Sequence, residues 1–141
     1  MILRFEIECD LIEGKIEVQD IPGIWDQKMS EYLGVNTEGN YQDGCLQDVH
    51  WPSGLFGYFP SYTIGAMTAA QLFRTATHSD LSIMSSLAVG DFMPLVAWLK
   101  KNIHSRGSST SFNQLLIDAT GEKLNSDHFI NHIKARYQPP Q

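Results

Sequence analysis

The sequence predicts an all-α fold of about six helices, joined in part by one long loop rich in aromatic residues and glycine. Two observations support this fold class. Apolar residues recur at helical spacing in most segments, and those segments are bounded by residues that start or stop helices. With 141 residues and 43% hydrophobic content, the chain is predicted to form one helical domain, residues 1–141, with a real core.

The first segment, residues 2–12, can be interpreted in two ways. Alternation of apolar and polar residues from Leu3 to Ile7 permits a strand, whereas the spacing of Ile7, Leu11 and Ile12 permits a helix that ends at Gly14. In a helix, its acidic residues would form a mostly solvated face. These residues are Glu6, Glu8 and Glu13.

An amphipathic helix is predicted next, after a short extended link at residues 16–18. Asp20 is a good N-cap, Pro22 falls in the first turn, and Gly34 is a stop signal. Apolar residues recur through residues 21–33 at helical spacing, and Trp25 among them is predicted to lie in the core.

Pro60 is predicted to open another helix, which runs through residues 61–76. One face of this helix carries small residues, which allow a neighbouring helix to approach closely. These are Gly65, Ala66, Ala69 and Ala70. We therefore expect this helix to be the most buried one.

Cap and stop residues divide the remaining chain into further helices. Ser79 or Asp80 caps a short helix that ends at Val89, and Asp91 caps the next, which ends at Gly107. Residues 112–119 form a helix that stops at Gly121. Asn125 or Ser126 caps the last helix, whose inward residues are predicted to be Phe129, Ile130, Ile133 and Tyr137, before a frayed tail at residues 138–141.

The net charge of −6 and a pI near 5.2 argue against nucleic acid and anionic membranes as partners. No apolar run approaches the ~18 residues of a membrane span, and the charged start does not resemble a signal peptide. Cys9 and Cys45 have no metal or redox spacing. A disulfide between them is possible, but free thiols fit the cytoplasmic location that we expect.

The stretch at residues 44–62 is the main candidate for function. It holds Trp51, Phe56, Tyr58, Phe59 and Tyr62 together with His50, three glycines and two prolines. We call residues 44–59 the aromatic loop. A semi-buried loop that packs rings and presents a few polar groups is typical of binding and catalytic sites.

The polar residues of this stretch have complementary chemistry. Asp48 can accept a hydrogen bond from a ring nitrogen of His50 and fix its tautomer. Gln47 can donate and accept, and Tyr58 and Tyr62 can donate from a phenol. In the simpler interpretation, His50 and Asp48 only tie down the loop while the rings fill the core.

Five residues carry a resemblance to a known family. The pattern Gly44-x-x-Gln47-Asp48-x-His50-Trp51 resembles the GxxQDxHW motif of the M32 peptidases, the carboxypeptidase Taq type. Further stretches are also similar to that family, and the resemblance covers nearly the whole chain. They include residues 3–8, 56–62, 69–73, 98–107 and 119–122. The resemblance favours a helix at residues 2–12.

The resemblance implies a C-terminal part, about the last quarter, of a larger helical zinc carboxypeptidase. The family's HExxH zinc motif and its IRxxAD motif are both absent here. The resemblance therefore implies no cofactor in this chain. In the full-length enzyme it implies zinc or another divalent metal. Implied partners are a peptide substrate and the missing N-terminal catalytic portion. As a fragment, the chain is also expected to form a homo-oligomer, because bare apolar faces promote contact.

Within this resemblance, three residues are implied to act in catalysis by orienting the peptide or stabilising the oxyanion. They are His50, Tyr58 and Tyr62. Gln47, Asp48 and Trp51 would shape and brace the substrate-binding wall. The alternative is a non-catalytic helical binding or scaffold module that retains only the fold, and the isolated chain is predicted to be inactive.

Three other histidines are candidate metal ligands or helix-end residues. His128 and His132 have the i, i+4 spacing that can clasp a metal ion, but Phe129 occupies the place of the general base in HExxH. We interpret the pair as exposed helix positions. His104 is interpreted as a helix-end residue, and no metal site is predicted in this chain.

Overall fold

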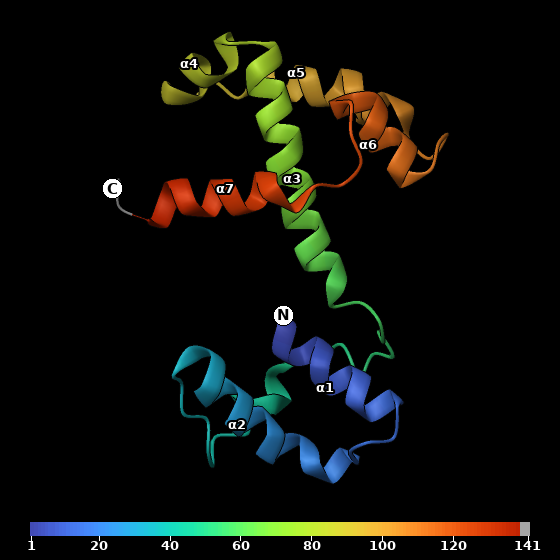
Figure 1. Cartoon of the computed structure of the whole chain (residues 1–141), viewed down its shortest axis with the longest axis vertical. Helices are drawn as coiled ribbons and strands as arrows, with labels where there is room; N and C mark the ends of the chain where they lie inside the picture. The colour runs from blue at the N-terminus through green and yellow to red at the C-terminus, as the bar shows by residue number, and fades with distance from the viewer. Residues whose placement is uncertain (139–141) are drawn as a thin grey trace. The chain divides into compact units, whose positions relative to one another are not determined.

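The computed structural model describes residues 1–138, and these contain α-helices and short 3₁₀ helices but no strand (Figure 1). The all-α prediction is confirmed. The α-helices are α1 Ile2–Ile12, α2 Ile21–Leu33, α3 Pro60–Ser79, α4 Ser82–Ala88, α5 Met93–Asn102, α6 Phe112–Thr120 and α7 Ser126–Tyr137. The 3₁₀ helices are η1 Val18–Asp20, η2 Cys45–Gln47 and η3 His104–Arg106.

The chain divides into two compact units, Met1–Thr63 and Ile64–Gln141, called here the first and second unit. The first turn of α3 belongs to the first unit and the rest of α3 to the second. The prediction of a single helical domain over residues 1–141 stays a prediction. No described helix combines the length and the hydrophobicity that crossing a membrane requires.

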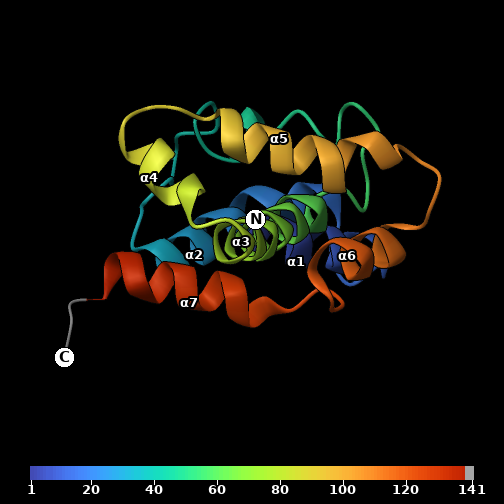
Figure 2. The same cartoon turned by 90° about the horizontal axis from the view of Figure 1, so that it is seen from above.

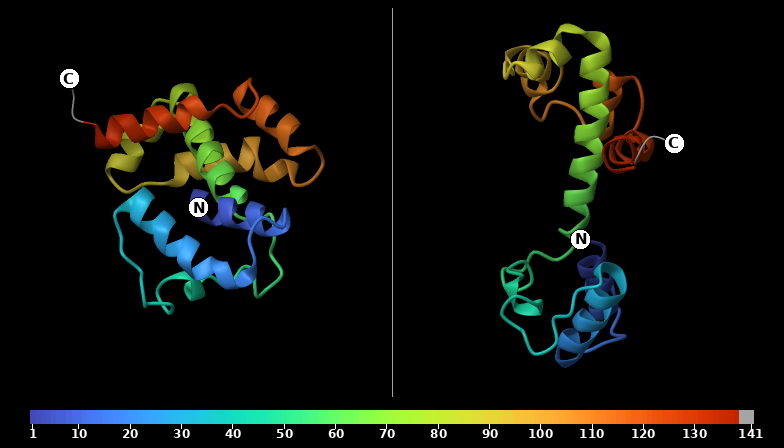
Figure 3. Two further views of the ribbon diagram at one scale, coloured as in Figure 1. Left: turned by 60° about the horizontal axis from the view of Figure 1, so that its bottom comes forward. Right: turned by 90° about the vertical axis from the view of Figure 1, so that its left-hand side faces the viewer.

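In the first unit, α1 and α2 lie side by side (Figures 1 and 3). Between them lies a core of Leu3, Ile7, Trp25 and Cys45, against which Trp51 of the aromatic loop also packs. The prediction of a core position for Trp25 is confirmed, since its exposed fraction is 1%. Cys9 and Cys45 are both free thiols.

Three local predictions in the first unit need correction. Glu8 is buried rather than solvated, because its carboxylate accepts hydrogen bonds from the aromatic loop. The predicted extended link ends at Glu17, because Val18 already begins η1. Asp20 precedes α2, but its carboxylate accepts from the backbone N–H of Glu17 and caps nothing in α2. Gly34 ends α2 in the left-handed conformation, as predicted.

The aromatic loop depends on a close backbone approach at Gly44. A Cβ atom at this position would lie 2.6 Å from the backbone oxygen of Asn40, closer than real Cβ contacts. The approach leads the chain into η2 and places Cys45 in the core. Further along, Phe59 is fully buried and leads directly into α3. The first glycine of the motif is therefore explained by packing.

In the second unit, α5 and α7 flank α3 on opposite sides (Figures 2 and 3). Gln71 of α3 is fully buried and joins α3 to the turn between α6 and α7. The prediction that this helix is the most buried one is wrong, because only Gln71 and Ala76 of α3 are buried. Its small-residue face instead lines an open hollow.

The predicted helix boundaries of the second unit are largely confirmed. Asp80 and Asp91 accept from the backbone N–H groups of Ser82 and Met93, the first residues of α4 and α5. The helix predicted to end at Gly107 ends at Asn102 instead, because the chain tightens into η3 before Gly107. Gly121 ends α6 in the left-handed conformation, and Asn125 caps α7. Three of the four residues predicted to face inward on α7 are exposed, namely Ile130, Ile133 and Tyr137. Of the predicted tail, residues 139–141 lie outside the described residues.

Candidate functional site

The predicted hydrogen bond between Asp48 and His50 is present in the first unit. The Asp48 carboxylate accepts from Nδ1 of the His50 ring at 2.6 Å and from the backbone N–H of His50 at 2.9 Å. Its second oxygen accepts from Nε of Arg4. The Asp48 side chain is only 3% exposed, so this carboxylate is enclosed by its donors.

The donors determine the charge of Asp48. Burial of the carboxyl raises its pKa, but the hydrogen bonds from the His50 backbone, the His50 ring and the Arg4 guanidinium outweigh burial. The pKa of Asp48 is therefore held below its ordinary value. An ionised carboxylate can only accept, so Nδ1 of His50 must carry the proton.

The other ring nitrogen of His50 faces Tyr62. Nε2 lies 2.9 Å from the Tyr62 hydroxyl, and the two rings meet edge to face at 5.8 Å between centroids. In a neutral imidazole, Nε2 accepts and the phenol donates to it. In the imidazolium form, Nε2 donates, and the Tyr62 hydroxyl is free to donate to a third group. Hydrogen bonds thus link Asp48, His50 and Tyr62 in one chain.

Two more rings, those of Tyr58 and Phe59, pack against His50. Tyr58 lies 5.5 Å from His50 and 5.4 Å from Tyr62 between centroids, and Phe59 lies 4.9 Å from His50. Trp51 meets Phe59 edge to face at 5.7 Å. Since Phe59 is buried while Tyr58 and Tyr62 are exposed, the cluster has an apolar base and a polar, accessible rim.

The indole of Trp51 is fixed by a buried carboxylate. Glu8 of α1, which is 2% exposed, accepts from Nε1 of Trp51 at 2.9 Å and from the backbone N–H of Gly57 at 2.6 Å. Trp51 is half-buried rather than buried. A carboxylate of α1 thus holds the Trp51 ring, and the bracing role expected for Trp51 stays a prediction.

Gln47 is the predicted site residue that lies apart from this cluster. Its side chain is exposed, and its Nε2 donates to the backbone carbonyl of Asp43 at 2.8 Å. The recorded bond therefore stabilises its own turn. The other five predicted site residues lie together in the first unit, and they are Asp48, His50, Trp51, Tyr58 and Tyr62.

Comparisons with known proteins show the family to which the chain belongs. The model of the Carboxypeptidase Taq (M32) metallopeptidase family matches residues 1–137. The chain belongs to the M32 metallopeptidase family. Carboxypeptidase 1 of Bacillus subtilis (strain 168) is 38% identical over 97% of the chain, and Thermostable carboxypeptidase 1 of Pyrococcus furiosus is 35% identical over the same share.

Solved structures agree with this assignment. Trypanosoma Cruzi Metallocarboxypeptidase 1 matches 97% of the chain with a TM-score of 0.90 and 44% identity. The chain covers 29% of that structure and 27% of the length of both curated relatives. It is therefore similar to one part of an M32 metallopeptidase.

The histidines predicted to lie at helix positions have different surroundings. Nε2 of His128 lies at hydrogen-bond distance, 2.6 Å, from a carboxylate oxygen of Glu122. This hydrogen bond is the main reason that the pKa of Glu122 is lowered. With a side chain 13% exposed, His128 is not the exposed residue that we predicted. His104 follows α5 at the start of η3 and is exposed, as expected. Within residues 1–138, no group of three or more His, Cys, Asp or Glu side chains could hold a metal ion.

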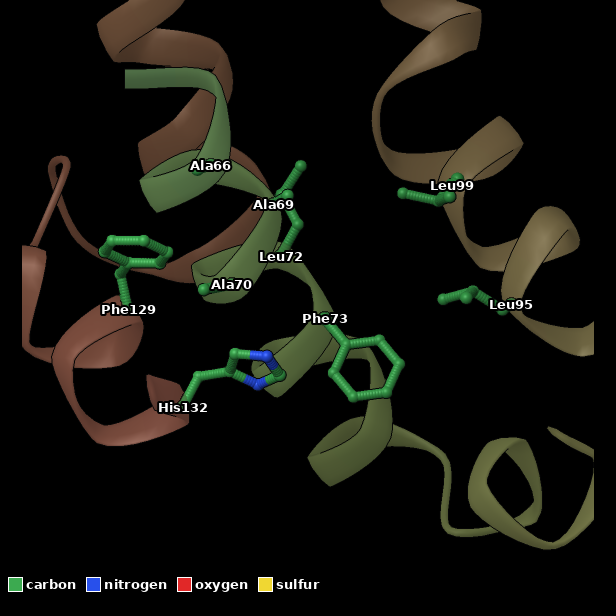
Figure 4. Close-up of a pocket in the computed structure, with 9 residues that line it drawn as sticks. All are labelled: Ala66, Ala69, Ala70, Leu72, Phe73, Leu95, Leu99, Phe129 and His132. Atoms are coloured by element: carbon green, nitrogen blue, oxygen red, sulfur yellow. The ribbon is translucent and has the colours of Figure 1, made fainter. Parts of the chain in front are cut away.

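The second unit contains an apolar hollow of about 600 Å³ (Figure 4). Alanines of α3, two leucines of α5, and Phe129 and His132 of α7 line it. His132 is the one titratable side chain in this lining. The hollow thus offers apolar surface and little chemistry, whereas the cluster around His50 offers ordered donors and acceptors.

Sequence reasoning missed two residues that contact the site, Arg4 and Glu8. Glu8 was assigned to a solvated face because of its charge. A helical projection contained part of the signal: Glu8 lies one turn after Arg4, at the edge of the apolar stripe that includes Ile7 and Leu11. A carboxylate at such a position requires hydrogen-bond donors from another part of the fold.

Proposed function

We propose that this chain forms the substrate-binding wall of a zinc-dependent carboxypeptidase that releases C-terminal amino acids from peptides. Membership of the M32 metallopeptidase family supports the reaction class. The observation that carries the proposal is the 2.9 Å contact between Nε2 of His50 and the Tyr62 hydroxyl, with Nδ1 fixed by Asp48. This arrangement places ordered hydrogen-bonding groups at an accessible rim.

Hydrolysis of a peptide bond passes through a tetrahedral intermediate whose oxygen develops negative charge. The Tyr62 hydroxyl is the donor best placed to contact such an oxygen, because its side chain is 44% exposed. His50 supports it from behind, since a proton on Nε2 directs the phenol hydrogen away from the ring. Tyr58, also exposed, serves as a second donor that orients the substrate's terminal carboxylate.

The three remaining site residues act as a brace. Asp48 keeps the proton on Nδ1 of His50, and Trp51 fixes the loop through Glu8. Gln47 lies exposed at the edge of η2, where its amide shapes the approach of the peptide.

The residues of this chain do not fit the metal that the family name implies. Residues 1–138 contain no suitable group of three ligands, and a catalytic zinc site needs three protein ligands and one open position. We therefore assign the metal ligands to a part of the enzyme outside this chain, the expected N-terminal catalytic portion. The steps assigned here to His50, Tyr58 and Tyr62 consist of binding and hydrogen bonding only.

The test uses a full-length M32 enzyme in which this chain replaces the matching segment, called here the complete enzyme. His50→Ala and Tyr62→Phe are each expected to lower kcat/KM on the order of 10²-fold, with bound metal unchanged. Tyr32→Phe is the matched control, because Tyr32 is 47% exposed and donates only to Glu6. His104→Ala is the control for the histidine. Near-full activity of both site variants would contradict the proposal and show that the aromatic loop has only a structural role.

The alternative function is a non-catalytic helical binding or scaffold module. The lack of a ligand group within residues 1–138 favours it for the isolated chain, which we expect neither to bind zinc tightly nor to hydrolyse peptides. Release of C-terminal amino acids by the isolated chain would contradict this. A cytoplasmic location and self-association as a homo-oligomer also stay predictions, the latter open to test by sedimentation.

A further inference from the structure

Two side chains of α1 contact the aromatic loop from the same face of the helix. Arg4 and Glu8 are four residues apart, so they project one turn from each other in the same direction. Nε of Arg4 donates to Asp48, and its guanidinium lies 4.9 Å from the centroid of the Trp25 ring. Glu8 accepts from the loop at two points. One rigid surface of α1 thus holds the loop at three places.

The three contacted residues flank the groups assigned to substrate binding. Asp48 lies two residues before His50, and Trp51 directly follows it. Gly57 directly precedes Tyr58, and its N–H donates to Glu8. Contacts that originate on α1 therefore limit the position of His50 on both sides and the position of Tyr58 on one side.

The supporting helix is itself well packed. Leu3 and Ile7, on the neighbouring apolar face of α1, lie in the core with Trp25. Trp25 is also the ring against which the Arg4 guanidinium lies. A side chain anchored in a packed helix holds its partner more accurately than a contact within a loop does.

We propose that Arg4 and Glu8 are positioning residues that hold His50 against Tyr62 by acting through Asp48, Trp51 and Gly57. This inference rests on the proposed function of His50 and Tyr62. Neither residue belongs to the GxxQDxHW motif, and neither contacts the accessible rim of the cluster directly.

Glu8→Gln is the sharpest variant, because it keeps the size of the side chain. A carboxylate accepts from both donors, whereas a carboxamide has one oxygen and directs its NH₂ group at the second donor. At least one of the two bonds, from Trp51 or from Gly57, must then be lost. Arg4→Lys keeps the positive charge but removes the planar Nε–H that Asp48 accepts.

The first measurement uses the isolated chain and needs no catalysis. In the NMR spectrum, Glu8→Gln should shift the indole N–H resonance of Trp51 while the resonances of Trp25 and Trp98 stay in place. Glu6→Gln is the matched control, since Glu6 lies on α1 but binds Lys28 and Tyr32 instead of the loop. An unchanged Trp51 resonance in Glu8→Gln would overturn the proposed anchor.

The second measurement is kinetic and uses the complete enzyme. Glu8→Gln and Arg4→Lys should each lower kcat by about 10-fold or more, because small displacements of a donor are costly to catalysis. Glu6→Gln should leave kcat within about twofold of the parent. In a His50→Ala background, Glu8→Gln should lower kcat by less than about twofold, because the group that it positions is gone.

The background experiment separates the two proposals. An equal loss of kcat from Glu8→Gln with and without His50 would overturn the positioning role, since Glu8 would then act independently of His50. Full activity of His50→Ala would instead contradict the proposed function. The Trp51 resonance would still decide whether Glu8 anchors the loop.

Discussion

The two units of the chain differ in what their buried polar side chains hold. In the first unit, the carboxylate of Glu8 binds Trp51 and Gly57 on either side of a turn in the aromatic loop. In the second unit, the amide of Gln71 donates to Thr120 and the Lys123 carbonyl and accepts from the backbone N–H of Asn125. Glu8 therefore supports a group of rings with accessible polar atoms, whereas Gln71 closes a helix–helix connection.

The units also differ in their cores. Leu3, Ile7, Trp25 and Cys45 form a contacting cluster in the first unit. Among the described residues of the second unit, the buried apolar side chains are the smaller set Ala76, Ile83 and Leu116. The candidate site is thus attached to the better-packed part of the chain. This suits a role that depends on accurate positions of the site's side chains.

The largest expected effect tests this difference in packing. Trp25→Ala should lower the free energy of unfolding by about 3–5 kcal/mol, because it removes a large buried ring from the core of the first unit. Trp98→Ala, at a half-buried position on α5, should cost clearly less. Urea unfolding of the isolated chain, followed by circular dichroism, measures both. Equal losses would mean that the two units are equally well packed.

A smaller effect is expected at the buried amide of the second unit. Gln71→Ala removes the partner of the Asn125 N–H and of the Lys123 carbonyl, and an unsatisfied buried group costs about 1–3 kcal/mol. Gln114→Ala, an exposed glutamine on α6, is the control. Thermal unfolding of both variants gives the comparison. A Gln71→Ala chain as stable as the control would show that the α6–α7 connection is held by other contacts.

The smallest effect concerns the charge of Asp48. Its contribution to stability is present at neutral pH and is lost only in acid. Because its folded-state pKa is lowered, the stabilisation is complete above the unfolded-state pKa of about 3.9 and is lost as the pH falls through the folded-state pKa. The stability difference between the parent and Asp48→Asn should thus be constant from about pH 7 to 5 and shrink in stronger acid. Urea titrations across this range measure it, with Asp127→Asn as an exposed control. A difference that grew on acidification would contradict the assignment of an ionised Asp48.

Local signals in the sequence predicted much of the fold. Gly34 and Gly121 end helices as expected because the left-handed conformation suits glycine. The bond between Asp48 and His50 was predictable because two residues of separation allow it in many loop conformations. These features depend on residues that are close together in the sequence, so they can be predicted from it.

The remaining features depend on distant contacts. The approach of Tyr62 to His50 spans twelve residues of a loop without periodicity, so no spacing rule predicts it. The burial of Glu8 depends on donors more than forty residues away. On α7, the periodic apolar residues Ile130 and Ile133 predicted an inward face, but in the described part of the second unit they are exposed. Periodicity identifies the apolar face of a helix without stating what covers it.

The central claim is that His50 and Tyr62 work as one unit in binding the reacting peptide. A double-mutant cycle on kcat/KM in the complete enzyme tests it most directly, with His50→Ala, Tyr62→Phe and the double variant compared at equal metal content. The account predicts that the double variant loses no more than about threefold beyond the worse single variant, because each change disables the same hydrogen-bonded pair. Losses that multiply, to about 10⁴-fold for two independent 10²-fold effects, would contradict it.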